Sequence, residues 1–447
     1  MGAIGGSITG LGVEQYYFYF IVGIFLIFSI AKFTNYQVNI AITFIFFLGL
    51  FAFLGGISLK IYKVIIFVSV IAIAFKRMKI KSIPRILYFN VMFVILSIVF
   101  WLSVVNNASS NVSLFNVLNQ YNKLLIPFLA VHIFIYESKY YKRNMSIQKL
   151  IFWLIYIQIF FAIIKFIIIG FQEGVVGSLS YSGGHVATIF PVFGFILLWY
   201  KKGERFKRKD WLTIIGLMLI GFMSMKRAIW FIMPIMILLI IIFVSKRYKF
   251  KTTFKFLPLV ILIFYLGVRT NPSLNIEKSF WGSFDISYVL EFADDYTFGD
   301  EDKNREGSGR GGGLISLISQ KNLSLFGDGI DATYLQGYDT FDDKKYGVFL
   351  KSSLSGTSFH LISFGIAGFT AFIMYLFSWI NLISNRKLRI VMTIFLLWEY
   401  ILYKGILFEH ITIGFLFSYI IIYTNNYYII KHNIHHLKEE SYNTKSK

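Results

Sequence analysis

The feature of this sequence that most constrains its fold is a series of continuous apolar stretches, each about twenty residues long. A helix of about twenty residues crosses the roughly 30 Å hydrocarbon core of a membrane, whereas barrel strands alternate apolar and polar residues. The sequence therefore predicts an all-α polytopic membrane protein of about 13 transmembrane helices, within a range of about 12–14. We expect these helices at residues 16–33, 36–57, 60–75, 86–105, 122–137, 148–170, 186–200, 211–225, 228–245, 255–268, 358–383, 388–404 and 406–424.

The composition excludes a soluble globular protein. Hydrophobic residues make up 56% of the 447 residues and charged residues only 15%, too few to cover an ordinary protein surface. The sequence has no cysteine, which excludes disulfide bonds and thiolate metal sites. The N-terminal segment before the first apolar stretch contains no Lys or Arg, so we expect no cleavable signal peptide.

Lys and Arg are concentrated in short connections between the apolar stretches, and their distribution predicts the orientation. Cytoplasmic connections of membrane proteins are enriched in basic residues, so we interpret the net charge of +21 in this way and expect no nucleic-acid partner. Connections 106–121 and 171–185 contain neither Lys nor Arg and are placed outside. The basic connections are placed in the cytoplasm with the tail from Lys431, and they are 76–85, 139–149, 201–209, 246–255 and 386–389.

Residues 269–357 form the one long hydrophilic segment, which this topology places outside the cytoplasm as a loop with short helices. The loop has 9 Lys or Arg and 14 Asp or Glu, a net charge of 9 − 14 = −5. Long loops within compact proteins are usually functional. The predicted organisation is therefore transmembrane helices 1 to 10 in residues 1–268, this loop, transmembrane helices 11 to 13 in residues 358–424, and a cytoplasmic tail at 425–447.

A glycine-rich sequence in this loop, Glu306-Gly-Ser-Gly-Arg310-Gly-Gly-Gly, is a candidate anion site. Glycines let the backbone approach an anion closely, a following helix directs its N-terminal amides at a phosphate, and a guanidinium adds paired hydrogen bonds. A flexible surface linker is an equally good interpretation, and the Gly-Lys-Ser/Thr ending of a P-loop is missing. The candidate ligands are Arg305, Ser308, Gly309 and Arg310.

Lys226 and Arg227 lie at a break between two predicted helices that the topology places outside, where basic residues are rare. A charge at this depth usually has a function, and an anionic ligand would explain it. The alternative is that both side chains extend to lipid headgroups without a further role.

Two histidines lie where outward segments enter apolar helices. His360, in Gly356-Thr-Ser-Phe-His360, is a candidate general base or phosphate ligand, and His185 is a weaker candidate of the same kind. A single interfacial histidine is more often structural, so that interpretation remains open for both. No His-x-x-x-His pair stands on an outward segment, the acidic pairs Asp294-Asp295 and Asp342-Asp343 are interpreted as solvated runs, and we predict no metal site.

Several of these residues together resemble the O-antigen polymerase and ligase family. The resemblance rests on Arg227 at an outer helix break and on the order of the motifs that follow it, in one large outer loop and at the start of the helix after that loop. These motifs are Ser308-Gly-Arg310, Phe326-Gly-Asp-Gly329, Thr357-Ser-Phe-His360 and Gly365-Ile-Ala-Gly368. Leu361 stands where members of the family often have Asn.

The resemblance implies an inverting, metal-independent glycosyltransferase without a cofactor, located in the bacterial cytoplasmic membrane with its active site facing outward. The donor would be an undecaprenyl diphosphate-linked glycan. Arg310 and Arg227 would stabilise the leaving diphosphate, and His360 would either take a proton or donate a hydrogen bond. His185, Lys226, Arg305, Ser308 and Gly309 would complete the substrate site.

Polymerase is the first interpretation, in which the growing glycan passes onto a lipid-linked repeat unit of a surface polysaccharide. The alternatives are a ligase that transfers the glycan to lipid A core, a lipid-linked oligosaccharide flippase or other transporter, and a non-catalytic scaffold. The expected partners are undecaprenyl diphosphate-linked oligosaccharides and membrane lipids, with a chain-length regulator protein as a further candidate.

Overall fold

The computed structural model of the chain consists almost entirely of helices. The strands among the described residues form one short antiparallel pair, β1 (Phe341–Asp342) with β2 (Val348–Phe349), in which Phe341 lies opposite Phe349. The all-α prediction is therefore confirmed. The structure describes residues 13–33, 36–53, 56–77, 84–106, 114–172, 174–180, 185–202, 206–244, 249–298, 310–319, 323–329, 341–342, 348–349, 355–402 and 410–425.

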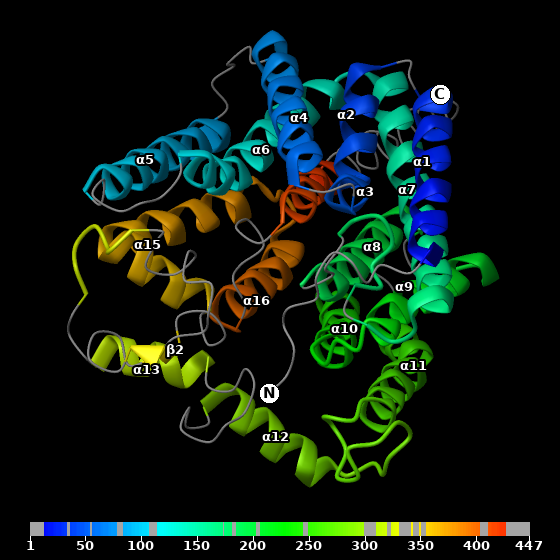
Figure 1. Cartoon of the computed structure of the whole chain (residues 1–447). Helices are drawn as coiled ribbons and strands as arrows, with labels where there is room; N and C mark the ends of the chain where they lie inside the picture. The colour runs from blue at the N-terminus through cyan, green and yellow to red at the C-terminus, as the bar shows by residue number, and fades with distance from the viewer. Residues whose placement is uncertain are drawn as a thin grey trace, which may run out of the picture. The chain divides into compact units, whose positions relative to one another are not determined.

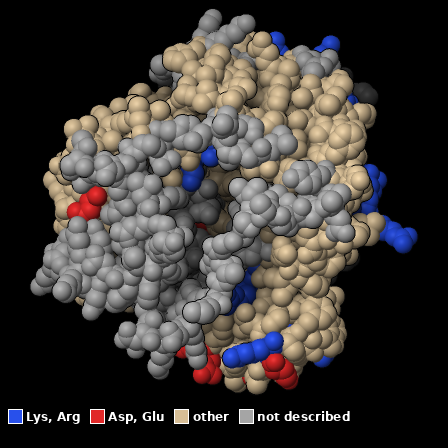
Figure 2. All heavy atoms as spheres, viewed as in Figure 1, with Lys and Arg blue, Asp and Glu red and all other residues tan. Residues whose placement is uncertain are grey.

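Three helices in the described ranges are long and apolar enough to cross a membrane, namely α5 (Pro84–Asn106), α7 (Tyr141–Ile169) and α15 (Gly356–Leu382). Most of the described surface visible in Figure 2 carries neither basic nor acidic groups. These features fit a membrane protein. Shorter apolar helices occupy Tyr17–Phe33, Gln37–Phe46, Ile61–Phe75, Ile229–Val244, Phe256–Thr270 and Ile411–Asn425.

The chain divides into two compact units, and two of the three boundaries between them along the chain fall inside a helix beside a proline. Unit 1 comprises Met1–Met78 and Leu129–Met233, and unit 2 comprises Lys79–Phe128 and Pro234–Lys447. One of these two boundaries lies in α6 (Leu114–Ser138), which contains Pro127, and the other lies in α10 (Ile229–Leu239), which contains Pro234. Proline removes one backbone hydrogen bond from a helix, so the intrahelical hydrogen bonding is interrupted near both of them. The third boundary, between residues 78 and 79, lies outside the described residues.

Unit 1 is built around α8 (Val186–Lys202), whose residues from Val186 to Tyr200 are all buried. A helix that is apolar on every side belongs inside a protein or a membrane, and the sequence of α8 has this pattern. α8 packs on α9 (Arg208–Met223), and α9 also packs on α7. Unit 1 also contains α1 (Val13–Phe33), α2 (Gln37–Phe46), α3 (Leu48–Phe53) and α4 (Gly56–Arg77).

Residues 174–180 of unit 1 are non-helical and largely buried, although the sequence suggested only an outward connection there. Gln158 of α7 donates to the Ser178 hydroxyl at 2.8 Å and accepts the Ser178 amide at 2.8 Å. The Gly49 amide donates to the Ser178 carbonyl at 2.8 Å. Buried irregular backbone needs such partners, and this contact accompanies the division of the predicted second span, 36–57, into α2 and α3.

Unit 2 is centred on α5 and α15, which run side by side (Figure 1, cyan and orange). Rings from these helices and α6 interlock between them. Phe89 stacks on Phe128 with centroids 5.2 Å apart and meets the edge of Trp379 at 5.0 Å, while Phe93 stacks on Phe128 at 3.8 Å. Each such pair adds about 0.5–1.5 kcal/mol beyond the burial of its area.

The remaining elements of unit 2 surround this core. α16 packs on α15 and on the π-helical turn η2, α12 packs on α13, and α13 also packs on α15 and α16. The elements of the predicted outer loop are therefore attached to the helical core. Their bounds are η2 (Ile240–Val244), α11 (Lys249–Thr270), α12 (Ile286–Phe298), α13 (Arg310–Ser319) and α16 (Arg386–Leu402).

Candidate functional site

The candidate site of unit 2 lies at a break in α15. Gly365 has φ 67° and ψ −166°, so the helix is interrupted there, ten residues after the N-cap residue Ser355. Each side of the break has backbone groups that have lost their helical partners. A broken helix inside an apolar core is tolerated only when other groups satisfy this backbone.

The outer-loop segment 323–329, which we call the clip, supplies these partners through four backbone hydrogen bonds. The amides of Asp328 and Gly329 donate to the carbonyls of Ile362 and Ser363 at 2.8 and 3.1 Å. The amides of Ile366 and Ala367 donate in return to the carbonyls of Ser324 and Leu325, at 3.2 and 3.0 Å. The clip thus ties the outer loop to both sides of the break.

Glycine is required on both sides of this contact. Gly327 and Gly365 both have positive φ, at 75° and 67°. A Cβ atom on Gly365 would stand closer than 3.0 Å to the backbone of Ser324, Leu325 and Gly327, and a Cβ on Gly327 would meet the backbone of residues 363–365 equally closely. Gly327 and Gly365 are therefore both required by one backbone contact.

His360 lies just over one turn before the break and is completely buried. Its Nδ1 atom lies 2.5 Å from the Gly356 carbonyl. Because a carbonyl only accepts, Nδ1 must carry the proton and donate it, and in the neutral ring Nε2 is then the hydrogen-bond acceptor. The fold thus fixes His360 in the tautomer that can take up a proton at Nε2.

Aromatic rings hold the imidazole of His360 in place. Phe372 stacks on it with centroids 4.0 Å apart and planes 17° apart, and the Tyr400 ring of α16 lies 5.3 Å away. The Thr357 hydroxyl donates to the Tyr400 carbonyl at 3.2 Å, so α16 is attached to the first turn of α15. The Tyr400 hydroxyl is buried and has no hydrogen-bond partner among the described residues.

Arg310 is the first residue of α13, and its side chain lies outside the described atoms. Leu317 of α13 forms a buried cluster with Leu361 and Ile362, the two residues that follow His360, and Leu314 packs against the same cluster. The structure therefore brings the helix that begins at Arg310 onto the segment of α15 that contains His360. Arg305, Ser308 and Gly309 lie outside the described residues.

Lys226, Arg227 and His185 belong to unit 1. Lys226 and Arg227 are half-buried in the turn between α9 and α10, directly after Met225, which has a φ of 54°. The Lys226 amide donates to the Gly221 carbonyl at 3.2 Å, and the Arg227 carbonyl accepts from the Trp230 amide at 3.2 Å.

This turn lies beside the end of α7, because rings connect the three segments. Phe171 meets the edge of Phe222 with centroids 5.2 Å apart, and Phe222 in turn meets Trp230 at 6.1 Å. His185 is buried at the start of α8, where its carbonyl accepts from the amides of Thr188 and Ile189. Lys226 and Arg227 therefore stand at a structured turn bordered by aromatic side chains.

Sequence reasoning missed the part played by Tyr400. Its contacts with Thr357 and His360 join residues about forty positions apart, and no spacing rule predicts such a pairing. The available signal was the polar pair Glu399 and Tyr400 in the otherwise apolar stretch 394–402, which marks a candidate functional position in a membrane protein. Within the described ranges, no three His, Asp or Glu side chains gather closely enough to hold a metal ion.

Comparison of the chain with models of protein families, with curated proteins and with solved structures finds no match.

Proposed function

We propose that the chain is a surface-polysaccharide polymerase, an inverting and metal-independent glycosyltransferase that acts on undecaprenyl diphosphate-linked glycans. The proposal includes about thirteen transmembrane helices, a cytoplasmic C-terminus and an active site at the outer face of the bacterial cytoplasmic membrane. The observation that carries it is the packing of α13, which begins at Arg310, on the residues that follow His360.

In the proposed reaction the acceptor hydroxyl attacks the anomeric carbon of the donor sugar. The new glycosidic bond forms as the bond from that carbon to the diphosphate breaks, and the diphosphate leaves with the electron pair. His360 takes the hydroxyl proton at Nε2, in the tautomer that the Gly356 carbonyl favours. The Arg310 guanidinium stabilises the charge on the leaving diphosphate.

The other predicted residues keep narrower roles in the proposal. Arg227, Lys226 and His185 remain candidate substrate ligands on sequence grounds. Arg305, Ser308 and Gly309 would bind the donor diphosphate beside Arg310, because a glycine-rich segment lets backbone amides approach an anion.

One observation favours a transporter as the second candidate. Transport proteins often bind their substrates at broken helices, and α15 is broken at Gly365, one turn after a buried histidine. A ligase is a third candidate, because it needs the same donor site as a polymerase and differs only in its acceptor.

Purified protein in liposomes with undecaprenyl diphosphate-linked repeat units, EDTA and no nucleotide sugar separates these candidates. A polymerase produces a ladder of longer glycans on a gel. A ligase extends no glycan until lipid A core is added, and a flippase changes the sidedness of the lipid-linked unit without changing its length. No product and no translocation in any arm would contradict the proposed function.

A further inference from the structure

The first part of the predicted outer loop exposes large apolar side chains, although the loop as a whole is acidic. They lie in the turn formed by residues 271–285, between α11 and α12, and on α12 itself, and their exposed fractions range from 36% to 64%. The set consists of Ile276, Phe280, Trp281, Phe284, Ile286 and Leu290.

The turn that presents these side chains is held by a dense set of hydrogen bonds. The Asn275 side chain donates to the carbonyls of Asn271 and Ser279 at 3.0 and 2.9 Å and accepts the Ser279 amide at 3.2 Å. The Gly282 amide donates to the Arg269 carbonyl at 2.8 Å, and the Arg269 Nε donates back to the Gly282 carbonyl at 2.8 Å. These hydrogen bonds therefore fix the conformation of the turn in which the rings are exposed.

Trp281 occupies an unusual backbone position in this turn. Its φ is 70°, a left-handed conformation that costs free energy for any residue with a side chain. The Arg269 guanidinium lies 4.7 Å from one face of the indole and donates to the Tyr265 hydroxyl at 2.9 Å. The fold thus holds the Trp281 side chain half-exposed near the end of α11, with the Arg269 guanidinium over its indole ring.

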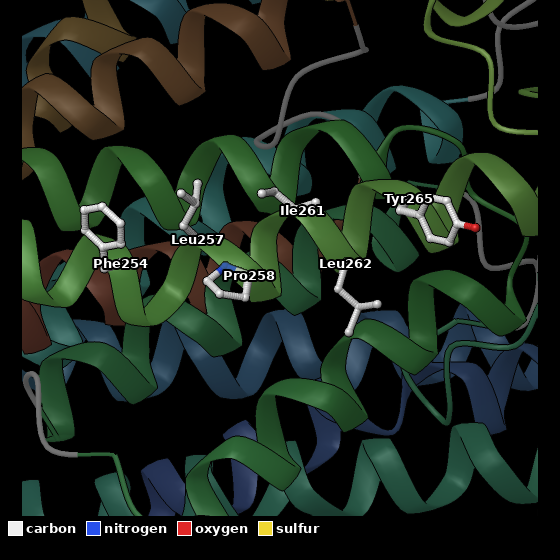
Figure 3. Close-up of a pocket in the computed structure, with 6 residues that line it drawn as sticks. All are labelled: Phe254, Leu257, Pro258, Ile261, Leu262 and Tyr265. Carbon is white, nitrogen blue, oxygen red and sulfur yellow. The ribbon is translucent and has the colours of Figure 1, made fainter.

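The apolar surface continues along α11. Figure 3 shows side chains that repeat on this helix and line a shallow groove without charged groups. Phe254, Ile261 and Leu262 are at least half exposed, and Tyr265 stands at the end of the row nearest the turn. A stripe of this kind on a helix of a membrane protein faces lipid.

The exposed side of α12 is apolar near the turn and acidic further along the helix. Ile286 and Leu290 stand one turn apart on one edge, and Asp294 follows Leu290 one turn later on the same edge. Glu291 is exposed about 100° round the helix from Leu290. Acidic atoms lie at the lower end of the face shown in Figure 2, with basic atoms beside them, where Figure 1 places α12. In its first turns α12 therefore has an apolar row, Ile286 and Leu290, beside a polar row that contains Glu291, which is the pattern of a helix at a membrane interface.

We propose that the turn 271–285 and the Ile286/Leu290 edge of α12 lie in the headgroup layer of the bilayer, continuous with the lipid-facing surface of α11. Tryptophan, tyrosine and arginine at the end of an apolar helix are the side chains that occupy this layer. A sugar-binding surface is less well supported, because the apolar side chains of the turn continue directly into the uncharged stripe of α11. This inference does not depend on the proposed function.

The absence of cysteine makes the test direct, because single cysteines can be introduced and labelled with an environment-sensitive fluorophore. We choose Leu290→Cys and Phe280→Cys as probes and Glu291→Cys, about 100° round α12 from position 290, as the matched control. All three side chains are exposed, so labelling leaves the core intact. The labelled full-length protein is reconstituted in phosphatidylcholine liposomes that contain nitroxide lipids with the spin label at the headgroup or deep in the chain.

The probes at positions 290 and 280 are expected to show blue-shifted emission and stronger quenching by the headgroup nitroxide than by the deep one, since interfacial helices enter by only about 5–10 Å. The control at position 291 is expected to be quenched by aqueous iodide. Equal iodide quenching at all three positions would overturn the inference. Protection of positions 280 and 290 by added polysaccharide, with no nitroxide quenching, would also overturn it and indicate a glycan surface.

Discussion

The contact between the clip and the broken helix makes Gly365 a position where one methyl group should have a large effect. In Gly365→Ala the new Cβ would stand closer than 3.0 Å to backbone atoms of Ser324, Leu325 and Gly327. Backbone atoms in a hydrogen-bonded segment cannot rotate away as a flexible side chain can. The alanine must therefore either displace the clip or straighten α15.

The cost has two parts. An alanine at φ 67° and ψ −166° occupies a region that is essentially restricted to glycine, at about 1–3 kcal/mol. Release of the clip loses four backbone hydrogen bonds at about 0.5–1.5 kcal/mol each, which sum to about 2–6 kcal/mol. Since release of the clip relieves some of the strain, we expect a net loss of about 3 kcal/mol or more in the free energy of closing the clip.

Amide hydrogen exchange in detergent or nanodiscs measures this loss at the four donors, Asp328, Gly329, Ile366 and Ala367. A loss of about 3 kcal/mol corresponds to roughly hundredfold faster exchange wherever local opening controls the rate. Gly23→Ala is the matched control. Gly23 lies in α1 with no heavy atom within 4 Å of a new Cβ, and alanine in a helix interior is more stable than glycine by about 0.5–1 kcal/mol. Unchanged exchange at all four amides in Gly365→Ala would refute the role of the clip.

Two further predictions concern buried and exposed turns. Gly177→Ala should destabilise unit 1 more than Gly170→Ala in a thermal denaturation series. Both glycines have φ near 70°, but of the two only Gly177 would bring a Cβ against the Gln158 side chain, at 2.5 Å. Equal effects of the two substitutions would show that this contact is unimportant. Hydrogen bonds from the Ser283 amide and hydroxyl hold the pKa of Glu277 below its ordinary value of 4.5. The carboxylate therefore stabilises the turn above its ordinary pKa, and protection of the Ser283 amide against exchange should be lost as the pH falls through the lowered pKa. Glu277→Gln should lose this protection already at neutral pH, and full protection in that variant would contradict the assignment.

The helical class and the positions of the long helices follow from local sequence, because about twenty consecutive apolar residues have few alternatives in a membrane. The contact at the α15 break does not follow from local sequence. Residues 324–329 and 362–367 are close only in the fold, and hydrogen bonds between backbone groups leave little trace in residue type beyond their glycines. The sequence therefore indicated Gly327 and Gly365 as separate features without indicating that they meet.

Charge and composition averaged over a segment also failed to predict the burial of particular residues within it. The net charge of residues 269–357 suggested a solvated loop, yet Trp281 and Leu290 are exposed apolar residues within it. Residues 174–180 lack Lys and Arg and were predicted as an outward connection, yet Ser178 is fully buried against Gln158. In both places the deciding partners lie on helices that are distant in sequence, and composition contains no information about them.

The proposed catalytic roles of His360 and Arg310 are tested most directly by the length of glycan that purified variants make from lipid-linked repeat units. Loss of a general base typically slows a reaction by about 10²–10⁴-fold, and loss of a group that stabilises developing charge slows it by about 10²–10³-fold. Lys387→Ala is the control, since Lys387 is an exposed cation at the start of α16. The account predicts a full ladder for the wild type and Lys387→Ala, with at most single additions by His360→Gln and Arg310→Ala in the same time. Full ladders from both of these variants, at normal protein levels, would contradict it.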